Sequence, residues 1–149
     1  MSGAGPHQRL FVYGTLLQGA NHPLGEFLRA NAELIGPGSI QAQLYVITEP
    51  QSGAETYPGA VPSTDPATRV YGELYALKGN AAELLAVLDD YENCSADWPE
   101  PHEFRRAIVP VALSAGRTLR ATAYLYCWDV SRARRLPGGR FLDATNAVA

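Results

Sequence analysis

A short apolar run near the N-terminus constrains this chain most, because it reads Leu10-Phe11-Val12-Tyr13-Gly14-Thr15-Leu16. An apolar run that ends at a glycine predicts a buried strand that breaks into a tight turn at Gly14. Such a turn can direct successive backbone N–H groups at an anion, and a glycine lets a ligand approach the main chain closely. Many buried strands also end at a glycine for structural reasons alone, so the run needs a second feature to indicate a binding site.

Composition limits the class of protein. The chain has 149 residues, of which 46% are hydrophobic and 18% are charged, as expected for one globular domain. We expect a loose tail over residues 1–8 and a single domain over residues 9–149. The net charge of -3 argues against nucleic-acid binding. Four arginines near the C-terminus are a local exception typical of a solvated basic face: Arg132, Arg134, Arg135 and Arg140.

The cysteine count, the first residues and the length of the apolar runs bear on the cellular location of the protein. Cys94 and Cys127 are too few for a disulfide framework and lack the spacing of metal ligands. The first residues do not resemble a secretory leader, and no apolar run reaches the ~20 residues that cross a bilayer. We therefore expect a soluble cytoplasmic protein with no membrane partner.

Periodicity and turn signals predict strands over residues 9–14, 39–48, 69–77, 104–113 and 118–128, and helices over residues 23–30 and 80–91. The second helix is the clearer one, because Asn80 can cap it and Glu83 follows three residues later. Pro110 favours a sheet edge or a bulge. Residues 49–66 are rich in Pro, Gly, Ser and Thr, so we expect an irregular segment, either a functional lid or disorder. The pattern predicts an α+β fold with a mixed, barrel-like sheet, one main helix and a few short helices.

A carboxylate at the end of the main helix is the second notable feature. Glu92 follows Leu88-Asp89-Asp90-Tyr91 at the last turn. The negative end of the helix dipole and the neighbouring carboxylates favour the protonated form and should raise the pKa of Glu92. A raised carboxyl pKa suits a general acid and base that works near neutral pH. An acidic helix end also fits a solvated surface with no chemical role.

Other chemistries have weaker support. Seven acidic or imidazole side chains could hold a hard cation, namely Asp89, Asp90, Glu92, Asp97, Glu100, His102 and Glu103. They lack the ordered spacing of a calcium loop, so we expect no metal. No phosphate-binding loop, dinucleotide fingerprint or serine nucleophile elbow is present, and we expect no cofactor.

The two features together resemble the gamma-glutamylcyclotransferase-like superfamily, nearest its short branch that includes gamma-glutamylamine cyclotransferases. That family has a Tyr-Gly-Ser/Thr-Leu loop after its first strand, matched by residues 13–16, and a catalytic glutamate in a Leu-Asp-x-x-Glu-Gly pattern, matched by residues 88–92. Residues 57–61 and 124–126 also look like family features. Asn93 departs from the pattern, where the family has glycine. So do the insert at residues 94–101 and Phe104, where the family often has tyrosine.

The resemblance implies an intramolecular aminolysis, in which the α-amine of a γ-glutamyl group attacks its own side-chain carbonyl and yields 5-oxoproline and a free amine. Glu92 would be the catalytic base and acid. The backbone of Gly14, Thr15 and Leu16 would bind the substrate α-carboxylate, and the other substrate-binding residues would be Tyr13, Tyr57 and Tyr124. The partner would be a small γ-glutamyl molecule whose leaving amine the resemblance leaves open, as it does the oligomeric state. A non-catalytic ligand-binding or interaction module on the same fold is the alternative.

Overall fold

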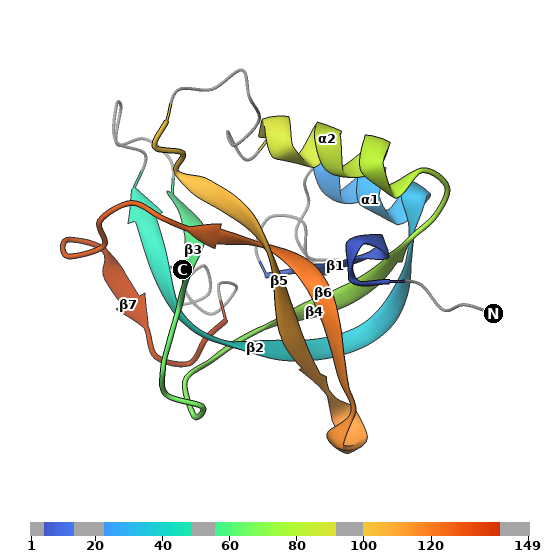
Figure 1. Ribbon diagram of the computed structural model, residues 1–149. Coiled ribbons are helices and arrows are strands. Elements are labelled where there is room, and N and C mark those ends of the chain that lie inside the picture. Colours follow the sequence, from blue (N-terminus) through green and yellow to red (C-terminus); the bar gives the residue numbers. More distant parts are fainter. Residues whose placement is uncertain (1–4, 14–22, 49–55, 92–99, 141–149) are drawn as a thin grey trace.

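The computed structural model describes residues 5–13, 23–48, 56–91 and 100–140, which form one sheet and two α-helices (Figure 1). The strands are β1 (Arg9–Val12), β2 (Ala32–Thr48), β3 (Thr56–Pro62), β4 (Arg69–Leu77), β5 (Phe104–Leu113), β6 (Thr118–Tyr126) and β7 (Arg134–Leu136). The helices are α1 (Pro23–Asn31) and α2 (Ala81–Tyr91), and short 3-10 turns cover Pro6–Gln8 and Ser114–Gly116.

The sheet closes into a five-stranded mixed barrel. Its order is β3-β2-β4-β1-β6-β5, and an additional pairing of β2 with β5 joins the two sides. The pair β1–β6 is parallel, whereas the other pairs are antiparallel. The strands β3 and β7 pair with β2 outside the closed ring. The predicted α+β, barrel-like fold is therefore confirmed.

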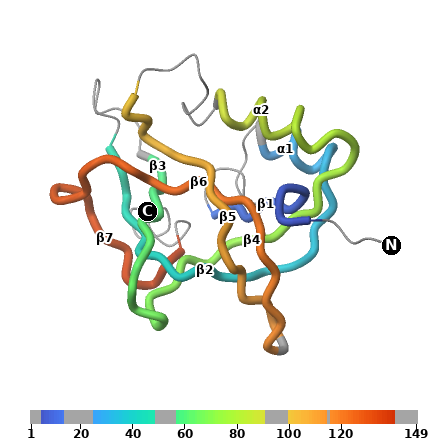
Figure 2. Tube along the Cα trace, viewed as in Figure 1, coloured from blue at the N-terminus to red at the C-terminus, as the bar shows by residue number. Residues whose placement is uncertain are grey.

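Local sequence signals account for α2 and for the β5–β6 hairpin. The side chain of Asn80 accepts a hydrogen bond of 3.1 Å from the backbone N–H of Glu83, so the predicted N-cap is confirmed. The hairpin runs in continuous register from the Phe104–Tyr126 pair to the Ala112–Thr118 pair. Its turn lies on the side of the barrel away from the helices (Figure 2). Neither described helix is long and apolar enough to cross a membrane.

The expectation of irregular structure over residues 49–66 is wrong for β3, which pairs with β2 over seven residue pairs. β3 contains two prolines, but it is an edge strand. Successive residues of a strand point their N–H groups to opposite sides. The N–H of Ala60 donates to the hydroxyl of Tyr13 and not to β2, and Pro58 and Pro62 have the same parity as Ala60. The N–H groups that Pro58 and Pro62 lack would therefore point away from β2, so no hydrogen bond between β2 and β3 is lost.

The sheet separates two hydrophobic clusters, and β1 contributes to both because its side chains alternate. Phe11 and Tyr13 lie in the cluster inside the barrel. Leu10 and Val12 lie in the other, which includes Leu28 of α1, Leu85 and Leu88 of α2, and Tyr124. Both helices cover the same face of the barrel (Figure 1). The Pro6–Gln8 turn also contacts the sheet, since the hydroxyl of Thr122 donates to the carbonyl of Pro6.

Candidate active site

Tyr13 connects three strands where the chain leaves β1. Its side chain is buried at 7% exposure. Its hydroxyl donates to the backbone carbonyl of Tyr124 on β6 and accepts the N–H of Ala60 on β3 at 3.3 Å. The phenol oxygen is thus engaged with the main chain of two other strands, which holds Tyr13, the last described residue of this segment, in place. Gly14, Thr15 and Leu16 lie outside the described residues, so the anion-binding role of the loop stays a prediction.

Tyr124 fastens the end of α2 to the sheet. Its hydroxyl donates to Asp89 at 2.6 Å and lies 3.4 Å from the carbonyl of Leu85. Arg106 of β5 forms an ion pair with the other carboxylate oxygen of Asp89 at 3.2 Å. Two strands therefore hold the last turn of α2, immediately before residue 92. The side chain of Glu92 itself lies outside the described residues.

The ion pair of Asp89 changes the electrostatic argument made from the sequence. The raised pKa predicted for Glu92 rested partly on repulsion from Asp89 and Asp90. The positive charge of Arg106 offsets that of Asp89, so Asp89 contributes less repulsion than an isolated carboxylate would. Glu92 lies outside the described residues, so the raised pKa expected from the helix dipole stays a prediction.

Tyr57 lies in a second tyrosine–carboxylate group, around Glu103. The Glu103 side chain is 6% exposed, although it directly precedes β5. Tyr57 of β3 donates its hydroxyl to the Glu103 carboxylate. Tyr126 of β6 is also hydrogen-bonded to Glu103, and burial together with the charge of Glu103 raises the pKa of Tyr126 to about 12. A buried carboxylate thus joins β3, β5 and β6 through two phenols.

Aromatic rings pack beside this group. The ring of Phe104 meets that of Tyr126 edge-on at 5.2 Å between centroids, and that of Tyr57 at 6.2 Å. Phe104 stands at the position where the resemblance described above implies tyrosine. In this chain, neighbouring strands supply the phenols of Tyr57 and Tyr126, and Phe104 contributes an apolar face between them.

The structure places two of the three predicted substrate-binding tyrosines on the same side of the sheet. Tyr57 and Tyr124 both belong to the cluster on the helix side of the sheet, and each donates its hydroxyl to a carboxylate. Tyr13 has its ring inside the barrel. The sequence analysis did not single out Tyr126, and it grouped Glu103 only with the acidic cluster. The burial of Glu103 depends on β3, which was not expected to be a strand.

A cation site is not evident in the described part of the chain. No group of three or more His, Cys, Asp or Glu side chains there could hold a metal ion. Glu92 and Asp97, two members of the acidic set considered above, lie outside the described residues. The carboxylates of Asp89 and Glu103 have phenol partners and form separate groups.

Comparison with known proteins identifies the family. The model of the family described as "Gamma-glutamyl cyclotransferase, AIG2-like" matches residues 10–143, so the chain belongs to this family. Searching the curated proteins gave no match.

Solved structures share the fold at low identity. An uncharacterized protein, PH0828 from Pyrococcus horikoshii, is 22% identical, with 94% of each chain covered and a TM-score of 0.60. An AIG2-like protein from Mus musculus is 21% identical, with 89% of this chain and 92% of that chain covered and a TM-score of 0.57. A gamma-glutamyl cyclotransferase is 17% identical, covering 85% of this chain and 68% of that chain with a TM-score of 0.58. The chain spans less than half of several longer matching proteins.

Proposed function

We propose that this protein is a γ-glutamyl cyclotransferase that converts a γ-glutamyl amine or dipeptide into 5-oxoproline and a free amine. The observation that carries the proposal is the family match over residues 10–143, together with the Tyr13–Leu16 loop and Glu92 within it. The reaction needs no metal or organic cofactor. We also propose a cytoplasmic location, in keeping with a chain that has two cysteines and no disulfide-framework pattern.

The reaction is a transfer of the γ-acyl group to the substrate's own α-amine. A free α-amine has a pKa of about 8, so most of it is ammonium at neutral pH and must lose a proton before it attacks. Glu92 accepts that proton as the amine forms a bond to the γ-carbonyl carbon. The same carboxyl then gives a proton to the departing nitrogen as the C–N bond breaks. Acid–base assistance of this kind contributes about 10²- to 10⁴-fold in rate.

Closure of a five-membered ring also requires that the substrate chain be held folded. Backbone N–H groups of Gly14, Thr15 and Leu16 are proposed to bind the α-carboxylate and thereby orient the amine toward the γ-carbonyl. Tyr57 and Tyr124 are proposed to contact the substrate from the helix side of the sheet. The hydrogen bonds of Tyr13 to β3 and β6 support this arrangement, because they hold the position from which the loop begins.

The contacts that hold the end of α2 against the sheet support the proposed role of Glu92. A general base must stay within hydrogen-bond reach of the proton it removes. The contacts of Asp89 with Tyr124 and Arg106 restrain the last turn of the helix, three residues before Glu92. A restrained helix end is the kind of support that a precisely positioned catalytic group requires.

A non-catalytic binding module is the second candidate, and Phe104 favours it because a phenol common in the family is absent. Release of 5-oxoproline from a panel of γ-glutamyl amines and γ-glutamyl dipeptides distinguishes the two candidates. The enzyme proposal expects turnover that the Glu92→Gln variant loses. Binding of 5-oxoproline without turnover of any panel member would support the binding module.

A further inference from the structure

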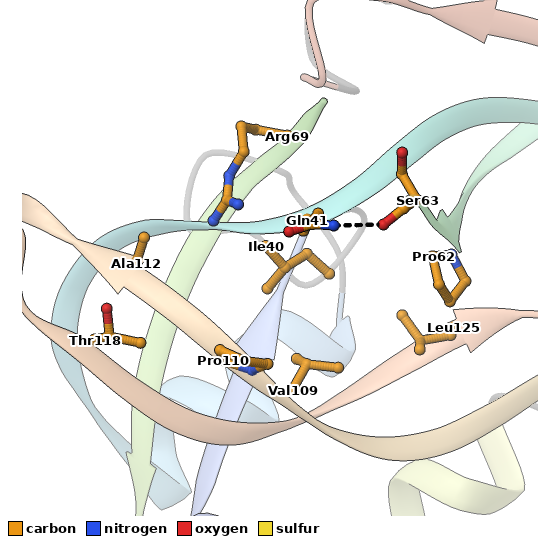
Figure 3. Close-up of a pocket in the computed structure, with 10 residues that line it drawn as sticks. All are labelled: Ile40, Gln41, Pro62, Ser63, Arg69, Val109, Pro110, Ala112, Thr118 and Leu125. Carbon is orange, nitrogen blue, oxygen red and sulfur yellow. Dashed lines mark hydrogen bonds between the residues drawn. The ribbon is translucent and has the colours of Figure 1, made fainter. Parts of the chain in front are cut away.

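A cavity lies away from the tyrosine–carboxylate groups, along the seam where β2 and β5 meet. Its volume is about 450 Å³, and Tyr13, Tyr57 and Tyr124 are not among the residues that line it. The side chains that surround it come from β2, β3, β4, β5 and β6 and from the segment after β3 (Figure 3). The lining includes Gln41, Ser63, Arg69, Val109, Pro110 and Leu125.

The course of the strands explains why a cavity forms there. β2 pairs with β5 through Gly38–Leu113 and Ser39–Ala112. Continuing this register would place Gln41 opposite Pro110, which has no N–H to donate. Beyond this point β2 pairs with β3, and β5 stays paired with β6. The two strands therefore diverge, and side chains rather than backbone bonds border the gap.

Arg69 provides the positive charge of this cavity, and its orientation is set by β2. Its Nε donates to the hydroxyl of Ser39 at 3.0 Å, and its Nη2 donates to the carbonyl of Ser39 at 3.0 Å. A guanidinium has five N–H donors, so three remain after these two bonds. Within the described part of the chain, no residue accepts from the remaining donors and no carboxylate pairs with Arg69. The guanidinium is thus held in one orientation with donors left for a ligand.

The rest of the lining defines what kind of ligand fits. Arg69, Gln41 and Ser63 lie along one side, whereas Val109, Pro110 and Leu125 lie along the opposite side (Figure 3). Among the described lining residues Arg69 is the one charged group, so a monoanion balances the site, and a dianion such as phosphate does not. A planar guanidinium matches a carboxylate in two parallel hydrogen bonds. Cavities of roughly 300–1,000 Å³ with apolar walls and few polar groups are typical of small-molecule sites.

We propose that this cavity is a second binding site, which takes a small carboxylic acid with an apolar body. The carboxylate pairs with the free N–H groups of Arg69, and the body lies against Val109, Pro110 and Leu125. The cavity is separate from the described part of the predicted active site, because Tyr13, Tyr57 and Tyr124 do not line it.

Binding of benzoate to the full chain, followed by proton–nitrogen correlation NMR, tests the proposal. We expect saturable shifts in the millimolar range at the amides of Gln41, Ser63, Ala112 and Thr118, and at the Nε–H of Arg69. Benzamide has the same shape without the charge, and it should bind at least about 10-fold more weakly, since the charge-assisted pair is lost. Inorganic phosphate should bind more weakly than benzoate.

Three variants test whether benzoate and benzamide bind in this cavity. Arg69→Gln should weaken benzoate at least about 10-fold and leave benzamide unchanged. Thr118→Trp places a large ring at an exposed position of the lining and should weaken both probes, which keeps the proposal testable if Arg69→Gln perturbs folding. Arg117→Gln removes an exposed arginine that does not line the cavity and should change neither.

The proposal is overturned if benzoate shifts none of these amides or shifts only residues around Tyr13 and Tyr124. It is equally overturned if benzamide binds as tightly as benzoate, if phosphate binds more tightly, or if Arg117→Gln weakens benzoate as much as Arg69→Gln does.

Discussion

The phenol of Tyr124 donates a 2.6 Å hydrogen bond to the carboxylate of Asp89, and so joins the end of β6 to the last turn of α2. Asp89 lies three residues before the predicted catalytic residue, and Tyr124 is a predicted substrate-binding residue. A contact between these two elements restrains the helix end on which the proposed chemistry depends. It also engages the hydroxyl of Tyr124, so any substrate contact of this residue involves its ring or a hydroxyl already shared with Asp89.

Tyr124→Phe should therefore lower both stability and activity. Loss of a hydrogen bond to a charged partner costs about 1.5–3 kcal/mol of unfolding free energy. Urea denaturation measures this cost, and 5-oxoproline release measures the accompanying loss of turnover. Tyr45→Phe is the matched control, because Tyr45 packs against the same cluster and no described residue forms a hydrogen bond with its hydroxyl. Equal stability of the two variants would contradict the prediction.

Glu92→Gln should abolish proton transfer and leave the fold intact. Glutamine keeps the size of the side chain but cannot cycle a proton, so turnover of a confirmed γ-glutamyl substrate should fall by at least about 10²-fold. Thermal unfolding should change little. Glu83→Gln makes the same chemical change at an exposed position of α2 and should retain full activity. Wild-type turnover of Glu92→Gln would remove Glu92 from the mechanism.

Stability should fall between pH 10 and pH 12 because of Tyr126. Burial and the nearby Glu103 raise the pKa of Tyr126 from 10.0 to about 12 in the folded state. A raised folded-state pKa contributes stability that is fully present below the unfolded pKa and is lost as the pH rises through the folded value. Tyr75 has a pKa raised in the same direction, chiefly by burial. Denaturation at a series of pH values should show this decline, and Tyr126→Phe should make it shallower. A decline of unchanged steepness in that variant would exclude Tyr126 as a source.

Gly72→Ala should destabilise the pairing of β4 with β1. A Cβ atom at Gly72 would lie 2.0 Å from the carbonyl oxygen of Val12, which is backbone and cannot move aside cheaply. Overpacking of this kind costs about 1–3 kcal/mol or more. Gly5→Ala is the control, because no atom of the described residues lies within 4 Å of a Cβ at that position. Thermal denaturation of both variants checks the prediction, and a Gly72→Ala protein as stable as Gly5→Ala would refute it.

Several elements were predictable because their signals lie in adjacent residues. The Asn80 cap and the apolar face of α2 are separated by only a few positions, so the helix is encoded locally. The apolar alternation over residues 39–48 and the tight connection between β5 and β6 are local in the same sense, and both the strand over these residues and the hairpin are confirmed. The Tyr13–Leu16 and Leu88–Glu92 motifs predicted the family, because each is a run of adjacent residues that can be recognised without knowing how the rest of the chain folds.

Tertiary structure alone decided the remaining features, since each depends on a neighbour distant in the sequence. β3 tolerates Pro58 and Pro62 only because it is an edge strand whose missing N–H groups face away from β2. Glu103 is buried because Tyr57 and Tyr126 reach it from two other strands. The cavity beside Arg69 exists because Pro110 ends the pairing of β2 with β5. In each case the residue's own chemistry could be read from the sequence, whereas the partner that gives it a role is decided by how strands distant in the sequence pair and pack.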